Sequence, residues 1–185
     1  GRAVALKLVP RSPLFADLAP RFEREARAAS RLDHPSLCAV YEIGADESTA
    51  WIAMRYVEGE TLASRIARGA AGPLDERLKL LEHAARALHV AHESGIVHRD
   101  VKPANVMVST RGEPVILDFG IARDDESGAP LTLTGDALGT PAYMAPEELR
   151  GGARHADRRA DVWSLGVTAF ETLCERRPFA EATRE

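Results

Sequence analysis

The most informative segment of the chain reads His98-Arg99-Asp100-Val101-Lys102-Pro103-Ala104-Asn105, and Asp118-Phe119-Gly120 follows thirteen residues after Asn105. The two stretches bring two carboxylates, an amide and an ammonium to loops on either side of a short predicted hairpin. Carboxylate and amide oxygens are ligands that suit Mg²⁺, and an ammonium attracts phosphate. We therefore expect Asp100, Lys102, Asn105 and Asp118 to bind a metal–phosphate complex, with one carboxylate left to act as a base.

The chain upstream of this segment has the pattern of a small sheet with one helix. Residues 3–9 are expected to form a strand, and residues 37–43 and 50–57 a hairpin around a polar turn. Residues 20–32 have helical spacing, with Glu25 on the apolar stripe and Glu23 off it. Because a carboxylate on an apolar face needs a partner, Glu25 is the first candidate to bind a cation, and Glu23 is the competing one.

Helices dominate beyond residue 58. Asp75 is expected to cap a helix, and 161–173 is expected to form a strongly apolar one. Residues 106–108 and 115–117 are short strands, and residues 121–142, which lack periodicity, are expected to form a long functional loop. The change from strands to helices predicts two lobes with a cleft between them. The expected buried face of the first helix carries Leu78, Leu81, Ala85, Leu88 and His92.

Composition limits the class of protein. The 185 residues suffice for one domain, and 45% of them are hydrophobic, which excludes disorder. A net charge of −4 argues against a nucleic-acid partner. The longest apolar runs have five residues, whereas a membrane-spanning helix needs about 20. Cys38 and Cys174 lack CxxC spacing and are expected to be buried, reduced thiols, with a disulfide as the alternative.

Together, the motifs resemble the catalytic domain of protein kinases, specifically the bacterial eukaryotic-like serine/threonine kinases. The resemblance implies an α+β, two-lobed fold: a small antiparallel β lobe with one helix at 1–57, and a mainly helical large lobe at 58–185. The matching motifs run in the family's order: Val4-Ala5-Leu6-Lys7, the helix bearing Glu25, His98 to Asn105, Asp118-Phe119-Gly120, Ala145-Pro146-Glu147 and Asp161-Val162-Trp163-Ser164-Leu165-Gly166.

The resemblance implies that the protein transfers the γ-phosphoryl group of ATP to serine or threonine hydroxyls of proteins, with ATP and Mg²⁺ as cofactors. In this family pattern Asp100 orients the substrate hydroxyl and accepts its proton. Asn105 and Asp118 match the two magnesium-binding positions. Lys102 matches the lysine that stabilises the transferring phosphoryl group in serine/threonine kinases.

Further residues match the nucleotide site of the family. Lys7 corresponds to the lysine that contacts the α- and β-phosphates, held by a salt bridge to Glu25. Met54 aligns with the residue that guards the back of the adenine pocket. Arg55, Tyr56 and Val57 resemble the hinge, whose backbone groups would bind adenine.

Other positions resemble structural and regulatory residues of the family. His98 has a side chain suited to base catalysis, but the resemblance makes it a packed structural residue. Asp161 is expected to bind the backbone around His98 and Arg99. Thr132 and Thr134 lie where related kinases autophosphorylate, and phosphate there would pair with Arg99.

The two ends of the chain depart from the family pattern. Six residues precede Lys7, whereas the family's glycine-rich loop would begin about fifteen or more residues before that lysine. The chain ends shortly after Arg177-Pro178-Phe179. We therefore expect residues 1–185 to be a single partial kinase domain, with little activity on their own.

Two alternatives to an active kinase stay open: a pseudokinase that binds partners without turnover, and a small-molecule phosphotransferase of related fold. The expected partners are protein substrates bearing serine or threonine, and a kinase–kinase dimer for autophosphorylation. We expect neither a nucleic-acid partner nor a membrane segment within the chain. The expected location is the cytoplasm; in many kinases that the chain resembles, a membrane helix beyond the kinase domain tethers the full-length protein.

Overall fold

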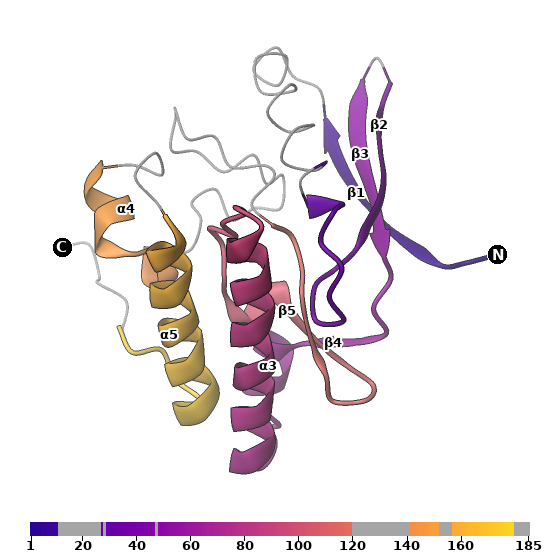
Figure 1. Ribbon diagram of the computed structural model, residues 1–185. Helices are drawn as coiled ribbons and strands as arrows, with labels where there is room; N and C mark the ends of the chain where they lie inside the picture. Colours follow the sequence, from indigo (N-terminus) through magenta and orange to yellow (C-terminus); the bar gives the residue numbers. More distant parts are fainter. Residues whose placement is uncertain (11–26, 28, 47, 120–140, 152–156, 180–185) are drawn as a thin grey trace.

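The computed structural model describes residues 1–10, 27, 29–46, 48–119, 141–151 and 157–179. A three-stranded antiparallel sheet forms the upper part of the molecule in Figure 1, and most of the helices lie below it. Its strands are β1 (Val4–Pro10), β2 (Val40–Ala45) and β3 (Thr49–Arg55), in the order β1-β3-β2. The expected strand at 3–9 and the hairpin after it are confirmed, as is the two-lobed α+β fold.

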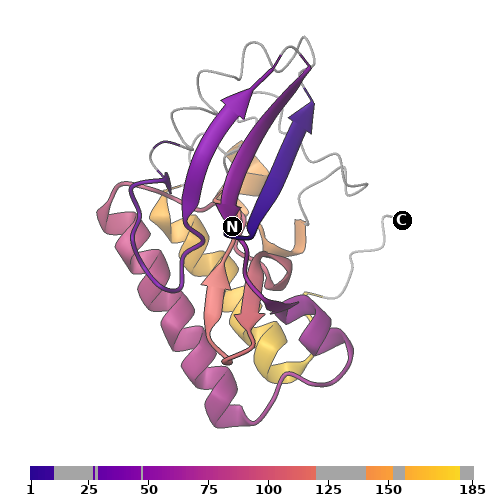
Figure 2. The same ribbon diagram turned by 90° about the vertical axis from the view of Figure 1, so that its right-hand side faces the viewer.

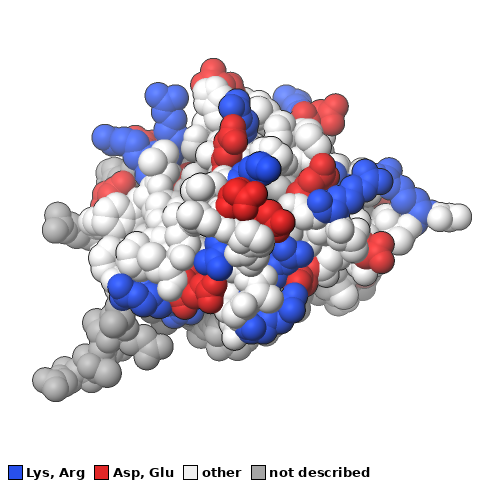
Figure 3. Space-filling view, turned by 90° about the horizontal axis from the view of Figure 1, so that it is seen from below, with Lys and Arg blue, Asp and Glu red and all other residues white. Residues whose placement is uncertain are grey.

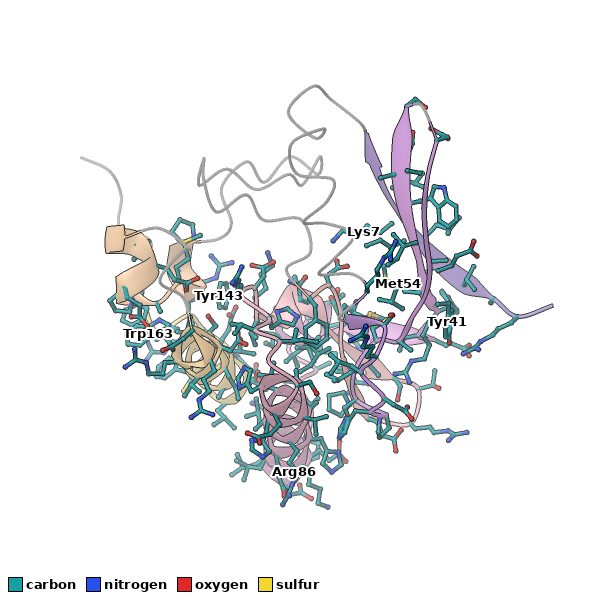
Figure 4. The ribbon with its side chains drawn as sticks, turned by 45° about the horizontal axis from the view of Figure 1, so that its top comes forward. Lys7, Tyr41, Met54, Arg86, Tyr143 and Trp163 are labelled. Atoms are coloured by element: carbon teal, nitrogen blue, oxygen red, sulfur yellow. The ribbon has the colours of Figure 1, made fainter. Side chains whose placement is uncertain are left out.

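Alternation along β1 directs Lys7 toward the interior of the molecule. Leu6 and Leu8 are exposed, whereas Ala5 and Lys7, on the opposite face of the strand, are half-buried. Lys7 pairs in register with Ile52 of β3, which is buried. Figure 4 shows Lys7 and Met54 on the side of the sheet that faces the helical lobe.

A second antiparallel sheet lies within the lower lobe. Its strands are β4 (Gly59–Thr61), β5 (Val106–Ser109) and β6 (Pro114–Ile116), in the order β4-β5-β6. Gly59 has a φ of 153°, and a Cβ there would lie 2.1 Å from the carbonyl oxygen of Val108. The pairing of β4 with β5 therefore requires glycine at this position.

Two long helices support this sheet. They are α3 (Leu74–Glu93) and α5 (Arg158–Cys174), which lie side by side in Figures 1 and 2 and contact each other. The shorter helices are α2 (Leu62–Ala67), α4 (Pro146–Gly151) and the 3₁₀ turns η1 (Pro103–Asn105) and η2 (Pro141–Tyr143). The largest core cluster joins α3 to both sheets, because Ala84, Ala87 and Leu88 pack with Ile52 and Ile116.

Arg77, in the first turns of α3, connects that helix to the end of α5. Its Nη1 donates to the carbonyls of Thr172 and Leu173, at 3.2 Å each, and its Nη2 lies 2.7 Å from Glu175 Oε1. These carbonyls belong to the last turn of α5, where no intrahelical donor is available. Glu175 ends the helix in the left-handed conformation, with a φ of 53°. One guanidinium thus caps α5 and fixes it against α3.

The expected N-cap of α3 was wrong, and its expected buried face was right only in part: Leu88 and the side chain of His92 are buried, whereas Leu78 and Ala85 are exposed. Pro73 occupies the N-cap, and Asp75 lies inside the first turn, where a carboxylate still interacts favourably with the helix dipole. Leu78 is 50% exposed. The small side chains of alanine allow the neighbouring elements to approach α3 closely, and the buried face therefore includes alanines that were not predicted. The residues it buries are Leu80, Ala84, Ala87, Leu88 and Ala91.

The expectation of two buried thiols holds for one cysteine. Cys38 is buried, but Cys174 is exposed at the end of α5, and both are free thiols. No helix in the described ranges is long and apolar enough to span a membrane. The face shown in Figure 3 carries acidic and basic side chains interspersed.

Candidate active site

Asp161 organises the loop that contains Asp100. Its Oδ2 accepts from the backbone N–H of His98 at 2.8 Å and lies 2.7 Å from His92 Nε2, while its Oδ1 accepts from Arg99 N at 2.7 Å. Asp161 is fully buried. Burial alone would raise the pKa of Asp161, but the hydrogen bonds from His92 and the two backbone groups outweigh it and lower the pKa. The predicted structural role of Asp161 agrees with these bonds.

The same bonds stabilise an uncommon backbone conformation at Arg99. Its φ is 64°, in the left-handed region that residues with side chains rarely adopt. Such a conformation persists where the surrounding structure holds it in place, and it is often found at active sites. Here the bond from Arg99 N to Asp161 fixes the turn that leads into Asp100.

His98 is a packed structural residue. Its Nδ1 accepts from Asp100 N at 3.2 Å, so its Nε2, which lies 2.7 Å from the carbonyl oxygen of Leu117, is the donor in that pair. The ring is fully buried and packs against Phe119, with centroids 4.8 Å apart. Since both nitrogens are bonded and the ring is closed to solvent, His98 has no free position from which to act as a base.

Asp100, Lys102 and Asn105 converge around the turn η1. Asp100 Oδ2 lies 3.0 Å from Lys102 Nζ and accepts from Asn105 Nδ2 at 2.8 Å. Asn105 Nδ2 also donates to the backbone carbonyl of Asp100, at 2.8 Å. Pro103 begins the 3₁₀ turn, which its fixed φ favours. The spacing of Asp100, Lys102 and Asn105 thus folds one carboxylate, one ammonium and one amide into direct contact.

Asp118 is brought to the same place by the hairpin of β5 and β6. The backbone N–H of Leu117 donates to the carbonyl oxygen of Asn105 at 2.8 Å, which joins the end of one motif to the start of the other. Asp118 then turns in the left-handed conformation, with a φ of 51°. Its Oδ1 lies 3.1 Å from Lys7 Nζ.

The pairing of Lys7 with Asp118 differs from the bridge that the sequence predicts. The expected partner of Lys7 is Glu25, which lies outside the described residues, so that bridge stays a prediction. Among the described residues, Asp118 is a carboxylate that contacts the same ammonium. Thr132 and Thr134 also lie outside the described residues.

The charges of the site form two ion pairs that are open to solvent. Side chains of the Lys7–Asp118 pair are 26% and 35% exposed, and those of the Lys102–Asp100 pair 20% and 25%. Solvent reaches all four side chains and screens the attraction between their charges. A ligand that brings phosphate and a cation can therefore exchange with them at little cost.

The donor set fits a magnesium ion. Asn105 uses its amide nitrogen to bind Asp100, which leaves its amide oxygen to face another partner. Asp118 has a second carboxylate oxygen beyond the one that contacts Lys7. In the part of the chain that the structure describes, no three His, Cys, Asp or Glu side chains cluster as a metal cage. Mg²⁺ commonly binds through one or two carboxylate or amide oxygens together with substrate phosphates and water, and the oxygens of Asn105 and Asp118 suit that mode.

The expected hinge begins at Arg55, the last residue of β3. Met54 is half-buried and lies on the Lys7 side of the sheet in Figure 4. The N–H of Arg55 donates to the carbonyl oxygen of Ala39 at 2.9 Å. Tyr56 is 58% exposed, and Val57 is half-buried.

His92 is the supporting residue whose role the sequence did not reveal. The sequence predicted that His92 lies on the helix before the loop of Asp100, but it did not predict the contact with Asp161. The side chain is 8% exposed and bonded to Asp161. A histidine on the inner face of an alanine-rich helix needs a polar partner, and that requirement was the available signal.

Comparison with known proteins places this geometry in a family. Residues 1–185 match the protein kinase domain family. The chain is 40% identical to the serine/threonine-protein kinase PknB of Mycobacterium leprae over 188 residues, which cover 96% of this chain and 29% of that protein. It is likewise 40% identical to PknA of Mycobacterium tuberculosis over 187 residues, covering 97% and 42%. With PrkC of Bacillus subtilis it shares 42% over 161 residues, covering 86% and 24%.

The chain belongs to the protein kinase domain family, as the resemblance of its motifs implies. It spans about a quarter to two-fifths of the length of these three relatives. Proteins of this family use ATP and Mg²⁺ and phosphorylate protein substrates.

Proposed function

We propose that the chain is the catalytic part of an ATP-dependent serine/threonine protein kinase. The observation that carries the proposal is the contact of Asp100 with Lys102 and Asn105, beside the pair formed by Lys7 and Asp118. Within a protein kinase domain, these groups supply a base, two cations for phosphate charge and two oxygen ligands for magnesium. The similarity to proteins named serine/threonine-protein kinases supports this substrate class.

Asp100 has the central role in the proposed reaction. Its carboxylate accepts a hydrogen bond from the serine or threonine hydroxyl, aligns the oxygen for attack and takes its proton as the new P–O bond forms. Asn105 donates to Oδ2 of Asp100, which keeps the carboxylate from rotating. Lys102, 3.0 Å from the same oxygen, places a positive charge where the transferring phosphoryl group passes between donor and acceptor.

The nucleotide is held by the remaining residues. Magnesium ATP supplies the phosphoryl group and a leaving group whose charge the metal neutralises. Asn105 and Asp118 would hold the metal through oxygen atoms, and Lys7 would leave Asp118 to bind the α- and β-phosphates. Met54 would bound the adenine pocket, and backbone groups of residues 55–57 would bind the adenine edge.

The proposal also covers regulation by phosphorylation, the lobe boundary and the cellular location. We propose that Thr132 and Thr134 are phosphorylated by a second copy of the chain, and that Arg99 then pairs with the phosphate. Glu25 is proposed as the further partner of Lys7, and residue 57 as the boundary between the lobes. Because ATP is the co-substrate, we place the activity in the cytoplasm.

The direct test is phosphoryl transfer by the intact protein. With Mg-ATP and a mixture of unfolded proteins, mass spectrometry should find new phosphoserine or phosphothreonine, and chelation of magnesium should abolish it. Asp100→Asn should lower the rate by about 10²–10⁴-fold. Nucleotide binding without any transfer would instead indicate a pseudokinase, and transfer only to small alcohols would indicate a small-molecule phosphotransferase.

A further inference from the structure

A short segment that precedes β2, residues 35–39, links the two ends of the proposed nucleotide site. On one side, residues 36–38 attach to β6: Ile116 N donates to Ser36 O and Cys38 N donates to Ile116 O, both at 2.9 Å. Leu37 and Ile116 form an isolated parallel bridge. Ile116 is two residues before Asp118, so this side of the segment is fixed to the strand that carries the phosphate-binding end.

On its other side the same segment is bonded to Arg55, the first hinge residue. Arg55 Nη2 donates to the carbonyl oxygen of Pro35 at 2.8 Å, and Arg55 N donates to Ala39 O at 2.9 Å. The thiol of Cys38 lies 3.5 Å from the carbonyl oxygen of Arg55, within the range of a weak sulfur hydrogen bond. The side chain and both backbone polar groups of Arg55 therefore contact residues 35–39.

Residues 35–39 have little freedom to move relative to the elements to which they are bonded. Ser36, Leu37 and Cys38 are all buried, with at most 6% of their surface exposed. Burial raises the pKa of Cys38 to about 11, so the thiol keeps its proton and remains a donor. Packed residues with saturated backbone bonds have little freedom to shift. A displacement of the hinge relative to Asp118 would therefore have to break bonds to this segment.

The guanidinium of Arg55 makes the bond that reaches furthest along this segment from the hinge. Its partner, Pro35, is twenty residues away in sequence, and the bond ties the hinge to the end of the segment that is far from Ala39. The backbone bond to Ala39 would form with any residue other than proline at position 55. The bond to Pro35 needs a donor on a long side chain, which explains why the identity of residue 55 matters.

We infer that the side chain of Arg55 is a positioning residue for the nucleotide. By binding Pro35 it fixes the hinge to the segment that is bonded to the strand before Asp118, and so sets the spacing between the adenine-binding edge and the phosphate-binding end. The inference rests on the proposed use of ATP. Its distinctive consequence concerns ligands that occupy both ends of the site rather than one.

The test compares a ligand that spans the site with one that occupies only the hinge. Equilibrium titration calorimetry would measure the Kd of Mg-ADP and of adenosine for the intact protein and for Arg55→Met, which keeps the length but removes the donor. We expect the Kd of Mg-ADP to rise about fivefold to tenfold, the effect of losing one hydrogen bond. The Kd of adenosine should change less than twofold. Arg55→Lys, which retains one cationic donor, should recover part of the Mg-ADP affinity.

Arg86→Met is the matched control. Arg86 pairs with Glu82 on the exposed surface of α3 and is labelled at the bottom of Figure 4. The Arg86→Met variant should leave the Kd of Mg-ADP and the Kd of adenosine unchanged. Equal weakening of adenosine and Mg-ADP in Arg55→Met would show local damage to the hinge and overturn the inference. Unchanged binding of both would overturn it as well. If the unaltered protein binds neither ligand, the proposed function fails and the inference fails with it. Should Arg55→Met not fold, Arg55→Ala, which also removes the donor, gives the same comparison.

Discussion

Asp100 lies in the loop that Asp161, on α5, holds in place, and the two aspartates differ in burial and in their partners. Asp161 is fully buried and accepts hydrogen bonds from His92 and from the backbone of His98 and Arg99. Asp100 is 25% exposed at its side chain and contacts Lys102 and Asn105, two groups that also suit phosphate and metal. The groups around Asp161 only bind its carboxylate. The groups around Asp100 can also bind the phosphate and the metal of a ligand.

The difference separates the framework from the chemistry. A buried charge with satisfied bonds fixes the geometry of its neighbours, because losing any bond leaves a polar group unpaired in the interior. Exposed pairs cost little to exchange, so they can serve a reaction in which partners change. We therefore expect substitutions around Asp161 to act on folding, and those around Asp100 and Lys7 to act on turnover.

The largest expected effect is on stability at Asp161. Asp161→Ala should lower the free energy of unfolding by about 3–5 kcal/mol, since His92 and two backbone N–H groups lose a buried partner. Urea unfolding followed by tryptophan fluorescence would measure it. Asp157→Ala, at the exposed N-cap of the same helix, should cost only about 1 kcal/mol. Equal costs at the two positions would contradict the distinction between buried and exposed aspartates.

Lys7→Arg should reduce turnover while leaving the fold intact. A planar guanidinium cannot reproduce a compact ammonium that contacts Asp118 and reaches phosphate, so kcat/KM should fall on the order of 10²-fold. Steady-state kinetics on the intact protein would measure this, with thermal melting to check the fold. Lys79→Arg, an exposed position on α3, is the control. Unchanged kcat/KM in Lys7→Arg would remove Lys7 from the mechanism.

Arg77→Lys tests the framework at its other end. A lysine can replace the charge of Arg77 but not its simultaneous bonds to Thr172, Leu173 and Glu175. We expect a loss of about 1–2 kcal/mol in the free energy of unfolding, with turnover per folded molecule unchanged. A variant as stable as the unaltered protein would show that the cap on α5 is dispensable.

Acid should produce the smallest of these effects near neutrality. The pKa of Asp161 is lowered in the folded state from an ordinary value of 3.8. Its contribution to stability is therefore complete above that value and is lost as the pH falls through the folded pKa. Urea midpoints should be nearly constant from pH 7 to 5 and should fall below about pH 4. A midpoint that rises in acid would contradict the sign of this shift.

Much of the site could be predicted because its residues lie close together in sequence. Asp100, Lys102 and Asn105 share one loop, and a hairpin of short strands returns Asp118 beside them, so local spacing already fixes their meeting. The contact of Lys7 with Asp118 could not be predicted this way. Lys7 comes from the other lobe, and its contact depends on how the lobes lie relative to each other.

The positions of the strands and helices could be predicted from the sequence more fully than the side of each helix that is buried. The strands around Lys7 and the helix of Asp161 follow from apolar patterning. The buried face of α3 does not, because alanine is compatible with both surfaces and only packing against the two sheets selects Ala84 and Ala87. Cys174 was expected to be buried because its neighbours in sequence are apolar, but it lies where α5 ends and is exposed.

The most direct measurement applies one change at both aspartates. Asp100→Asn and Asp161→Asn each exchange a carboxylate for an amide of the same shape. For each variant, urea unfolding and Mg-dependent phosphoryl transfer would be measured on the same preparation. The account predicts that Asp100→Asn keeps the urea midpoint and nucleotide affinity while losing transfer by about 10²–10⁴-fold. It predicts that Asp161→Asn lowers the midpoint, with transfer falling in proportion to the folded fraction. Transfer near the unaltered rate in a folded Asp100→Asn protein would contradict the central claim.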